Sequence, residues 1–160
     1  MNFLSAILVG MLLSLLPVIE LRGGIPITIS QGVNPILALL FCSIANIIII
    51  PLIFLFLDHA HKYFLNFRTY RNTFNVFLKK IRIKKERVEK NYQTYGMIAL
   101  TLFVAIPLPI TGAWTGTFIA WLLNLNKKKS FLAISLGVII AGVIVTLIAT
   151  GIWAALKFLI

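Results

Sequence analysis

The first 57 residues of this chain contain only two charged side chains, Glu20 and Arg22. Both belong to the segment Glu20-Leu21-Arg22-Gly23-Gly24-Ile25-Pro26, which interrupts a long apolar stretch. A charge inside an apolar segment is costly, and in a membrane protein it marks a functional site by default. The adjacent Gly and Pro residues break helices, and irregular backbone at membrane depth needs protein or a water-filled cavity around it. The segment therefore predicts a buried polar pocket.

The composition indicates an all-α integral membrane protein forming a single domain, residues 1–160. The chain is 60% hydrophobic and only 12% charged, whereas a soluble domain carries about 25% charged residues. The net charge is +11, and most Lys and Arg residues cluster at 62–90 and 127–129. Clusters between apolar blocks are what the positive-inside rule produces, so we expect a multi-pass protein of the cell membrane and no nucleic-acid partner.

Four apolar blocks follow one another along the chain, at about 3–29, 35–57, 97–125 and 130–158. A spanning helix needs about 20 apolar residues, so the second and fourth blocks are predicted to cross the membrane. The first and third blocks are also long enough, but Gly and Pro interrupt each of them. We keep a kinked full span as an alternative for both.

The third block lies between the two basic clusters. If both clusters are cytoplasmic, this block must enter and leave on one side, as a re-entrant helical hairpin turning near 107–112. The first block would then be a re-entrant hairpin from the opposite face. This predicts an inverted repeat of hairpin plus transmembrane helix, a recurring transporter plan, with repeat one at 1–57 and repeat two at 96–160.

The segment between the repeats, 58–95, is predicted to be a basic cytoplasmic linker. Apolar residues between Phe74 and Tyr92 fall near helical spacing with Lys and Arg between them. A helix on the inner leaflet, held by anionic lipids, fits this pattern. A solvated hairpin whose charge only sets the topology is equally consistent with it.

Within the first motif, Glu20 is the candidate proton carrier, because burial disfavours the charged form of a carboxyl group. Arg22 stays charged and offers a planar fork suited to phosphate or carboxylate. Gly23 and Gly24 allow the backbone to turn and approach a ligand closely, and Pro26 completes the predicted hairpin tip. The alternative is structural: Glu20 and Arg22 pair, or cap separate groups, and only hold the tip in place.

A second cluster is predicted to form the opposing tip, and its candidate residues are Pro107, Pro109, Thr111, Gly112, Trp114 and Gly116. Trp114 would line the site or anchor the protein at the membrane interface. Asn46 in the second block is costly in lipid unless bonded, so it should face the pocket or another helix. Asp58, His59 and His61 are interpreted as boundary residues, and no metal, cofactor or enzyme motif is predicted.

The order ELRGGIP, Asn46 with Pro51, Leu57-Asp58, the segment 103–116 and Ile140-Ala141-Gly142 resembles the putative small multidrug export protein family. That family is similar to a compact branch of the DedA/VTT superfamily. The resemblance implies two facing re-entrant hairpins, with Glu20 and Arg22 as functional charges, and translocation of a polyprenyl phosphate or phospholipid. One departure is that residues 103–105, where DedA-type hairpins usually carry an arginine, are Phe-Val-Ala.

These observations predict a secondary membrane transporter, proton-coupled, that moves a lipid-linked phosphate or phospholipid or exports small amphipathic molecules. The expected partners are membrane lipids, the substrate and protons. A homodimer is a candidate assembly because one protomer offers little protein to shield two hairpins. The non-transport alternative is a structural or lipid-organising membrane protein.

Overall fold

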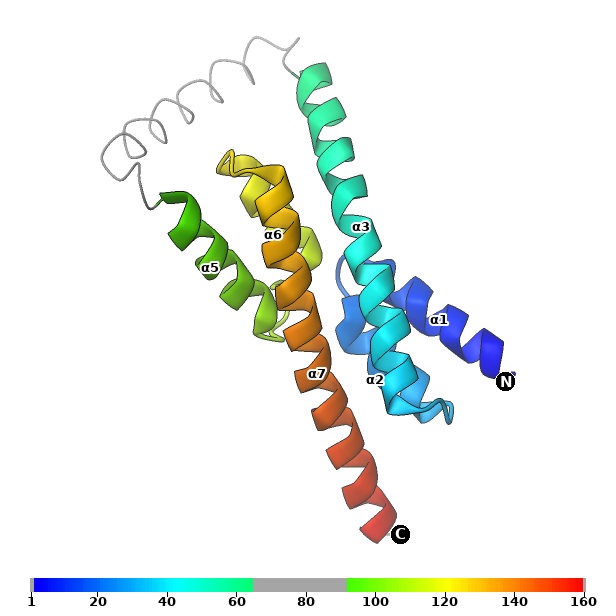
Figure 1. Cartoon of the computed structure of the whole chain (residues 1–160). Coiled ribbons are helices and arrows are strands. Elements are labelled where there is room, and N and C mark those ends of the chain that lie inside the picture. The colour runs from blue at the N-terminus through cyan, green and yellow to red at the C-terminus, as the bar shows by residue number, and fades with distance from the viewer. Residues whose placement is uncertain (1, 65–91, 160) are drawn as a thin grey trace.

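The computed structural model describes residues 2–64 and 92–159, and the regular structure in these ranges is helical (Figure 1). The helices are α1 (Phe3–Leu15), α2 (Glu20–Ser30), α3 (Pro35–Phe64), α5 (Tyr92–Ala105), α6 (Ala113–Leu122) and α7 (Lys127–Leu159). The all-α prediction is confirmed for this part of the chain. The predicted amphipathic segment of the linker lies outside the described residues, apart from Tyr92.

Two of these helices are long and apolar enough to cross a membrane, α3 with 30 residues and α7 with 33. Each leaves large apolar side chains uncovered, such as Ile36, 73% exposed, and Leu147, 66% exposed. Surfaces of this kind are stable against lipid and costly in water. Helix length and apolar surface together indicate a membrane protein, as predicted.

The long helices α3 and α7 run antiparallel (Figure 1). Lys127 at the start of α7 pairs with Asp58 near the end of α3. Further along, Gly142 packs so closely on Leu39 and Ser43 that an added Cβ would lie within 2.9 Å of both side chains. The basic residues that end α3 and those that begin α7 therefore lie at the same end of the molecule.

The first and third blocks fold back on themselves as helical hairpins. In the α1–α2 hairpin, a Cβ at Gly24 would lie 2.6 Å from the backbone oxygen of Gly10. In the α5–α6 hairpin, one at Gly116 would lie 2.7 Å from Val104. The four arms have 13, 11, 14 and 10 residues, each shorter than the roughly 20 residues that span a bilayer.

The turn of the first hairpin differs from the prediction. It lies at residues 16–19, and Gly23, Gly24 and Pro26 are inside α2. The prediction that these three residues break the helix is wrong, because Gly24 serves close packing on α1 and the helix continues through Pro26. The second turn agrees better, since Pro107 and Pro109 lie in the α5–α6 connection and Gly112 is the N-cap of α6.

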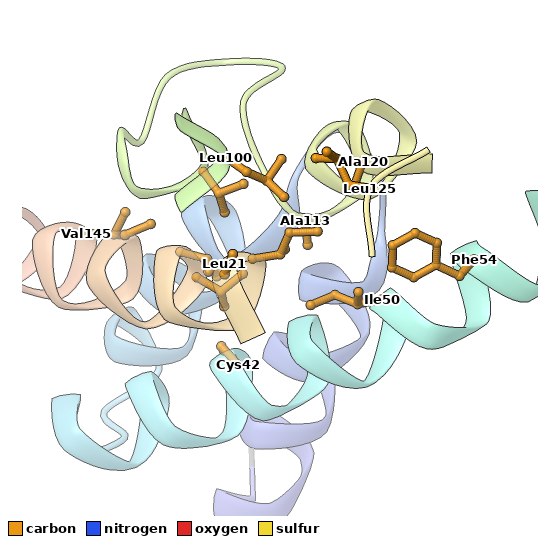
Figure 2. Packing of buried hydrophobic residues seen from close by; sticks show 14 of the residues in the cluster. Leu21, Cys42, Ile50, Phe54, Leu100, Ala113, Ala120, Leu125 and Val145 are labelled. Carbon is orange, nitrogen blue, oxygen red and sulfur yellow. The ribbon is translucent and has the colours of Figure 1, made fainter. Parts of the chain in front are cut away.

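The core lies where α2, α5 and α6 meet α3 and α7 (Figure 2). Its largest fully buried apolar side chains include Leu21, Ile25, Val104 and Ile134. Helix α7 approaches α5 closely at Ala133, whose backbone oxygen accepts a hydrogen bond from Thr101, and at Gly137, which packs on Thr101 and Val104. Small residues let helix backbones approach in membranes, where lipid removes the usual hydrophobic drive for association.

Gly137→Ala should lower the free energy of unfolding by about 1–3 kcal/mol, the usual cost of overpacking. Its new Cβ would lie 2.8 Å from the backbone oxygen of Thr101 and from Val104. Gly151→Ala is the matched control on the same helix, because nothing lies within 4 Å of that position. Equilibrium unfolding in mixed micelles measures both, and equal stabilities for the two variants would contradict the close α5–α7 packing.

Candidate functional site

The two hairpins meet at the carboxylate of Glu20. This side chain is 4% exposed, and its Oε1 accepts a hydrogen bond of 3.2 Å from the backbone N–H of Trp114. Trp114 is in the first turn of α6, where N–H groups have no partner within the helix. A negative charge is also favourable at a helix N-terminus. Glu20 therefore caps α6 from the other hairpin.

The cap depends on Gly112, which directly precedes α6. A Cβ at this position would overlap the Glu20 carboxylate, so only glycine allows the close approach. Glu20 itself has a left-handed backbone with φ of 49°. Such a conformation costs a non-glycine residue of order 1 kcal/mol or more, and it persists only where surrounding contacts impose it.

The side chain of Trp114 makes a second bond between the hairpins. Its indole N–H donates to the backbone oxygen of Leu15 at 3.0 Å. Leu15 is the last residue of α1, where carbonyl groups lack partners within the helix. Each hairpin thus satisfies a backbone group at a helix end of the other.

Arg22 also reaches across to the opposing hairpin. Its Nη2 donates to Thr111 Oγ1 at 3.0 Å, and Thr111 donates in turn to the backbone oxygen of Ile106 at 2.7 Å. The Nε of Arg22 is buried without a hydrogen-bond partner. No salt bridge joins Arg22 to Glu20 among the contacts found in the described ranges. Of the two structural alternatives, separate contacts rather than an ion pair are realised.

Asn46 completes the site from the middle of α3. It is 0% exposed, and it lines the same small space as Glu20, with Val138 and Ala141 of α7 on the other side. Its amide atoms make no hydrogen bond within the usual distance and angle limits, but the amide lies close enough to the Glu20 carboxyl group to interact with it. Side chains fill the site so closely that no water-sized space remains. The carboxylate of Glu20 is therefore enclosed at the contact between the hairpins, and Arg22 is half-buried beside it.

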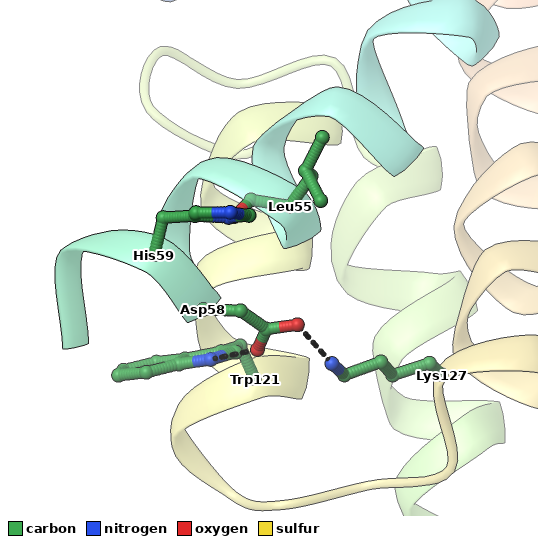
Figure 3. A network of polar contacts seen from close by, with 5 residues as sticks. All are labelled: Leu55, Asp58, His59, Trp121 and Lys127. Atoms are coloured by element: carbon green, nitrogen blue, oxygen red, sulfur yellow. Dashed lines mark hydrogen bonds and ion pairs between the residues drawn. The ribbon is translucent and has the colours of Figure 1, made fainter. Parts of the chain in front are cut away.

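A second polar cluster ties three helices together away from the hairpin contact (Figure 3). Asp58 of α3 accepts a hydrogen bond of 3.1 Å from the indole N–H of Trp121 in α6 and pairs with Lys127 of α7. The ring of His61 packs edge-on against Trp121. A cavity of about 270 Å³ adjoins this cluster. The sequence indicates Asp58 only as a boundary residue, and nothing in it points to these contacts.

Residues 20–144 match the family described as "Putative small multi-drug export protein". This range is well over half of the 160-residue chain. The chain belongs to this family. Searches of curated proteins and of solved structures found no match.

The family match begins at Glu20 and includes every candidate residue of both hairpins and Asn46. The family's description is of an exporter rather than an enzyme. The structure brings Glu20, Arg22, Asn46, Thr111, Gly112 and Trp114 to the hairpin contact. Gly23, Gly24, Pro26 and Gly116 lie within the hairpin arms, and Pro107 and Pro109 shape the second turn.

Glu20→Ala should destabilise the protein by about 1 kcal/mol, the typical cost of losing a helix cap. Glu20→Gln should cost less, because its side-chain oxygen can still accept the Trp114 N–H. Equilibrium unfolding in mixed micelles compares the two variants. Equal losses for Ala and Gln would show that the bond to α6 contributes nothing.

Proposed function

We propose that this protein is a secondary membrane transporter, proton-coupled through Glu20, with Arg22 as the substrate contact. The observation that carries the proposal is the burial of Glu20, with the half-buried Arg22 beside it, where the two hairpins meet. Buried charges at the contact of short helices are typical of transporter sites near the bilayer midplane. The family description, which names small multi-drug export, supports the transport class.

The proposed topology has the two hairpins entering the membrane from opposite faces. The short arms and the antiparallel course of α3 and α7 support it. Repeat one would be 1–57 and repeat two 96–160, joined by the linker 58–95. The basic residues near the ends of α3 and α7 would then both be cytoplasmic, as the positive-inside rule favours.

In the proposed mechanism, protonation of Glu20 loosens the contact between the hairpins. A neutral carboxyl group loses its attraction to the positive N-terminus of α6. The contact would then rest on the bonds from Arg22 and Trp114. Separation of the hairpins would expose Arg22 and Asn46 to the substrate. Binding of a proton and release of the hairpin contact are thereby coupled.

Two substrate classes follow from the two charges. A lipid-linked phosphate or phospholipid, as in the DedA-like resemblance, would use the guanidinium of Arg22. An amphipathic cation would use the carboxylate of Glu20. The contacts favour the anion, because Glu20 already faces the positive end of α6 whereas the Nε of Arg22 has no partner. Arg22 would act alone, since residues 103–105 carry no charge.

The alternative is a structural or lipid-organising protein through which nothing passes. The closed packing around Glu20 and its use as a helix cap favour this alternative. A structural protein should show no substrate-driven proton movement. A transporter should lose coupling when Glu20 is neutralised, even where the fold is kept.

Proteoliposomes containing a pH-sensitive dye test the proposal with a polyprenyl phosphate and with an amphipathic cation such as ethidium. Wild type should show substrate-driven proton flux, and Glu20→Gln should reduce it to the rate of protein-free liposomes. Arg22→Ala should abolish movement of the phosphate lipid, and Arg22→Lys should restore part of it. Unchanged flux in Glu20→Gln would remove the proton carrier, and phosphate-lipid movement that survives Arg22→Ala would remove the anion site.

Single cysteines and a membrane-impermeant maleimide test the topology. Lys62→Cys and Lys129→Cys should be labelled from one face, and Asn34→Cys from the other, because α3 would cross between residues 34 and 62. Wild type is the control, since its single cysteine, Cys42, is buried. Labelling of positions 62 and 129 from opposite faces would exclude the proposed topology.

A further inference from the structure

A groove of about 440 Å³ lies between the second half of α3 and the first turns of α7. Pro51 and Phe54 of α3 line one side, and Lys127, Lys128, Phe131 and Leu132 of α7 line the other. The volume is within the range of small-molecule sites, about 300–1,000 Å³. The groove is separate from the Glu20 contact, with which it shares no lining residue.

The interior of the groove is apolar. Phe54 forms its buried side at the edge of the core (Figure 2), while Leu132 is 67% exposed and continues the apolar outer face of α7. Pro51 contributes no backbone N–H to this surface. An acyl chain that enters from the bilayer would contact rings and methyl groups along its length.

Positive charge lies at the α7 end of the groove. The ammonium group of Lys127 is held by Asp58, which neutralises it (Figure 3). Lys128 is exposed and lines the groove, and no carboxylate of residues 2–64 or 92–159 forms a salt bridge with it. The first turn of α7 contains no acidic residue, and lysines at a helix N-terminus oppose the helix dipole. Helix stability therefore does not account for this charge; the positive-inside rule does, and the same charge is available to an anionic ligand in the groove.

We propose that the groove holds one anionic phospholipid, with an acyl chain on Phe54, Phe131 and Leu132 and the phosphate at Lys128. Apolar walls beside a lysine match the two parts of such a lipid. A zwitterionic lipid would bring its own positive group close to the same lysine, so its binding free energy there would be less favourable. The lipid would be a structural lipid and not a transported substrate, so the proposal does not depend on transport.

Native mass spectrometry of the full chain in detergent tests the site, with titration by phosphatidylglycerol and by phosphatidylcholine. Wild type should bind one phosphatidylglycerol more tightly than phosphatidylcholine. Lys128→Gln should weaken this binding about fivefold, the effect of one lysine near an anionic lipid. Lys129→Gln is the matched control, because it removes the same charge from the next residue, which does not line the groove.

Equal weakening in the two lysine variants would replace the specific site with general electrostatic attraction and overturn the proposal. Equal retention of the two lipids by wild type would overturn it as well. Competition by glycerol 3-phosphate tests the acyl chain. Weak competition supports a role of the apolar groove in lipid binding. Competition as strong as that of the intact lipid would show that the groove contributes nothing to the binding.

Discussion

The carboxylate of Glu20 at the N-terminus of α6 is the contact on which the arrangement of the two hairpins depends. Helix ends leave backbone groups without partners, and an unbonded polar group in an apolar setting costs several kcal/mol, by an approximate transfer scale. Here each hairpin supplies a partner for the other. The Glu20 carboxylate accepts a hydrogen bond from the backbone N–H of Trp114 in α6, and the Trp114 indole donates one to the backbone oxygen at the end of α1. Neither hairpin satisfies these groups alone, so the pair forms the stable unit.

Some of the buried polar atoms that make no regular hydrogen bond in the described residues lie at the same contact, while others belong to Gln31, Ser43 and Ser135. The Nε of Arg22 has no hydrogen-bond partner and the Asn46 amide makes no regular hydrogen bond, and Glu20 has a left-handed backbone. Buried unsatisfied groups are rare in native proteins and call for an explanation. Strained and unsatisfied residues cluster where a structure changes state. Their position at the hairpin contact is consistent with a site that opens, and it supports the proposed role of these residues.

The sequence predicted the features that depend only on neighbouring residues, namely the long apolar helices and the proline-containing turn. Uninterrupted apolar blocks predicted α3 and α7, and Pro107 and Pro109 predicted the second turn, because proline removes a backbone donor. The first turn was placed wrongly because glycine serves both turns and close helix packing, and only the partner helix decides between them for Gly24. The contacts of Asp58 were missed because Trp121 and Lys127 are more than 60 residues away in the chain, a pairing that helical periodicity does not reveal.

Both acidic side chains in the described ranges, Glu20 and Asp58, bind α6. Glu20 binds the backbone at its N-terminus, and Asp58 binds the indole of Trp121 near its C-terminus while also pairing with Lys127. Release of one end alone would leave α6 attached at the other. In the proposed mechanism, α6 would stay attached to α3 at the Asp58 end when the Glu20 contact opens. The proposed loss of the Glu20 contact on protonation would therefore release the N-terminus of α6 and leave the bond at Trp121 in place.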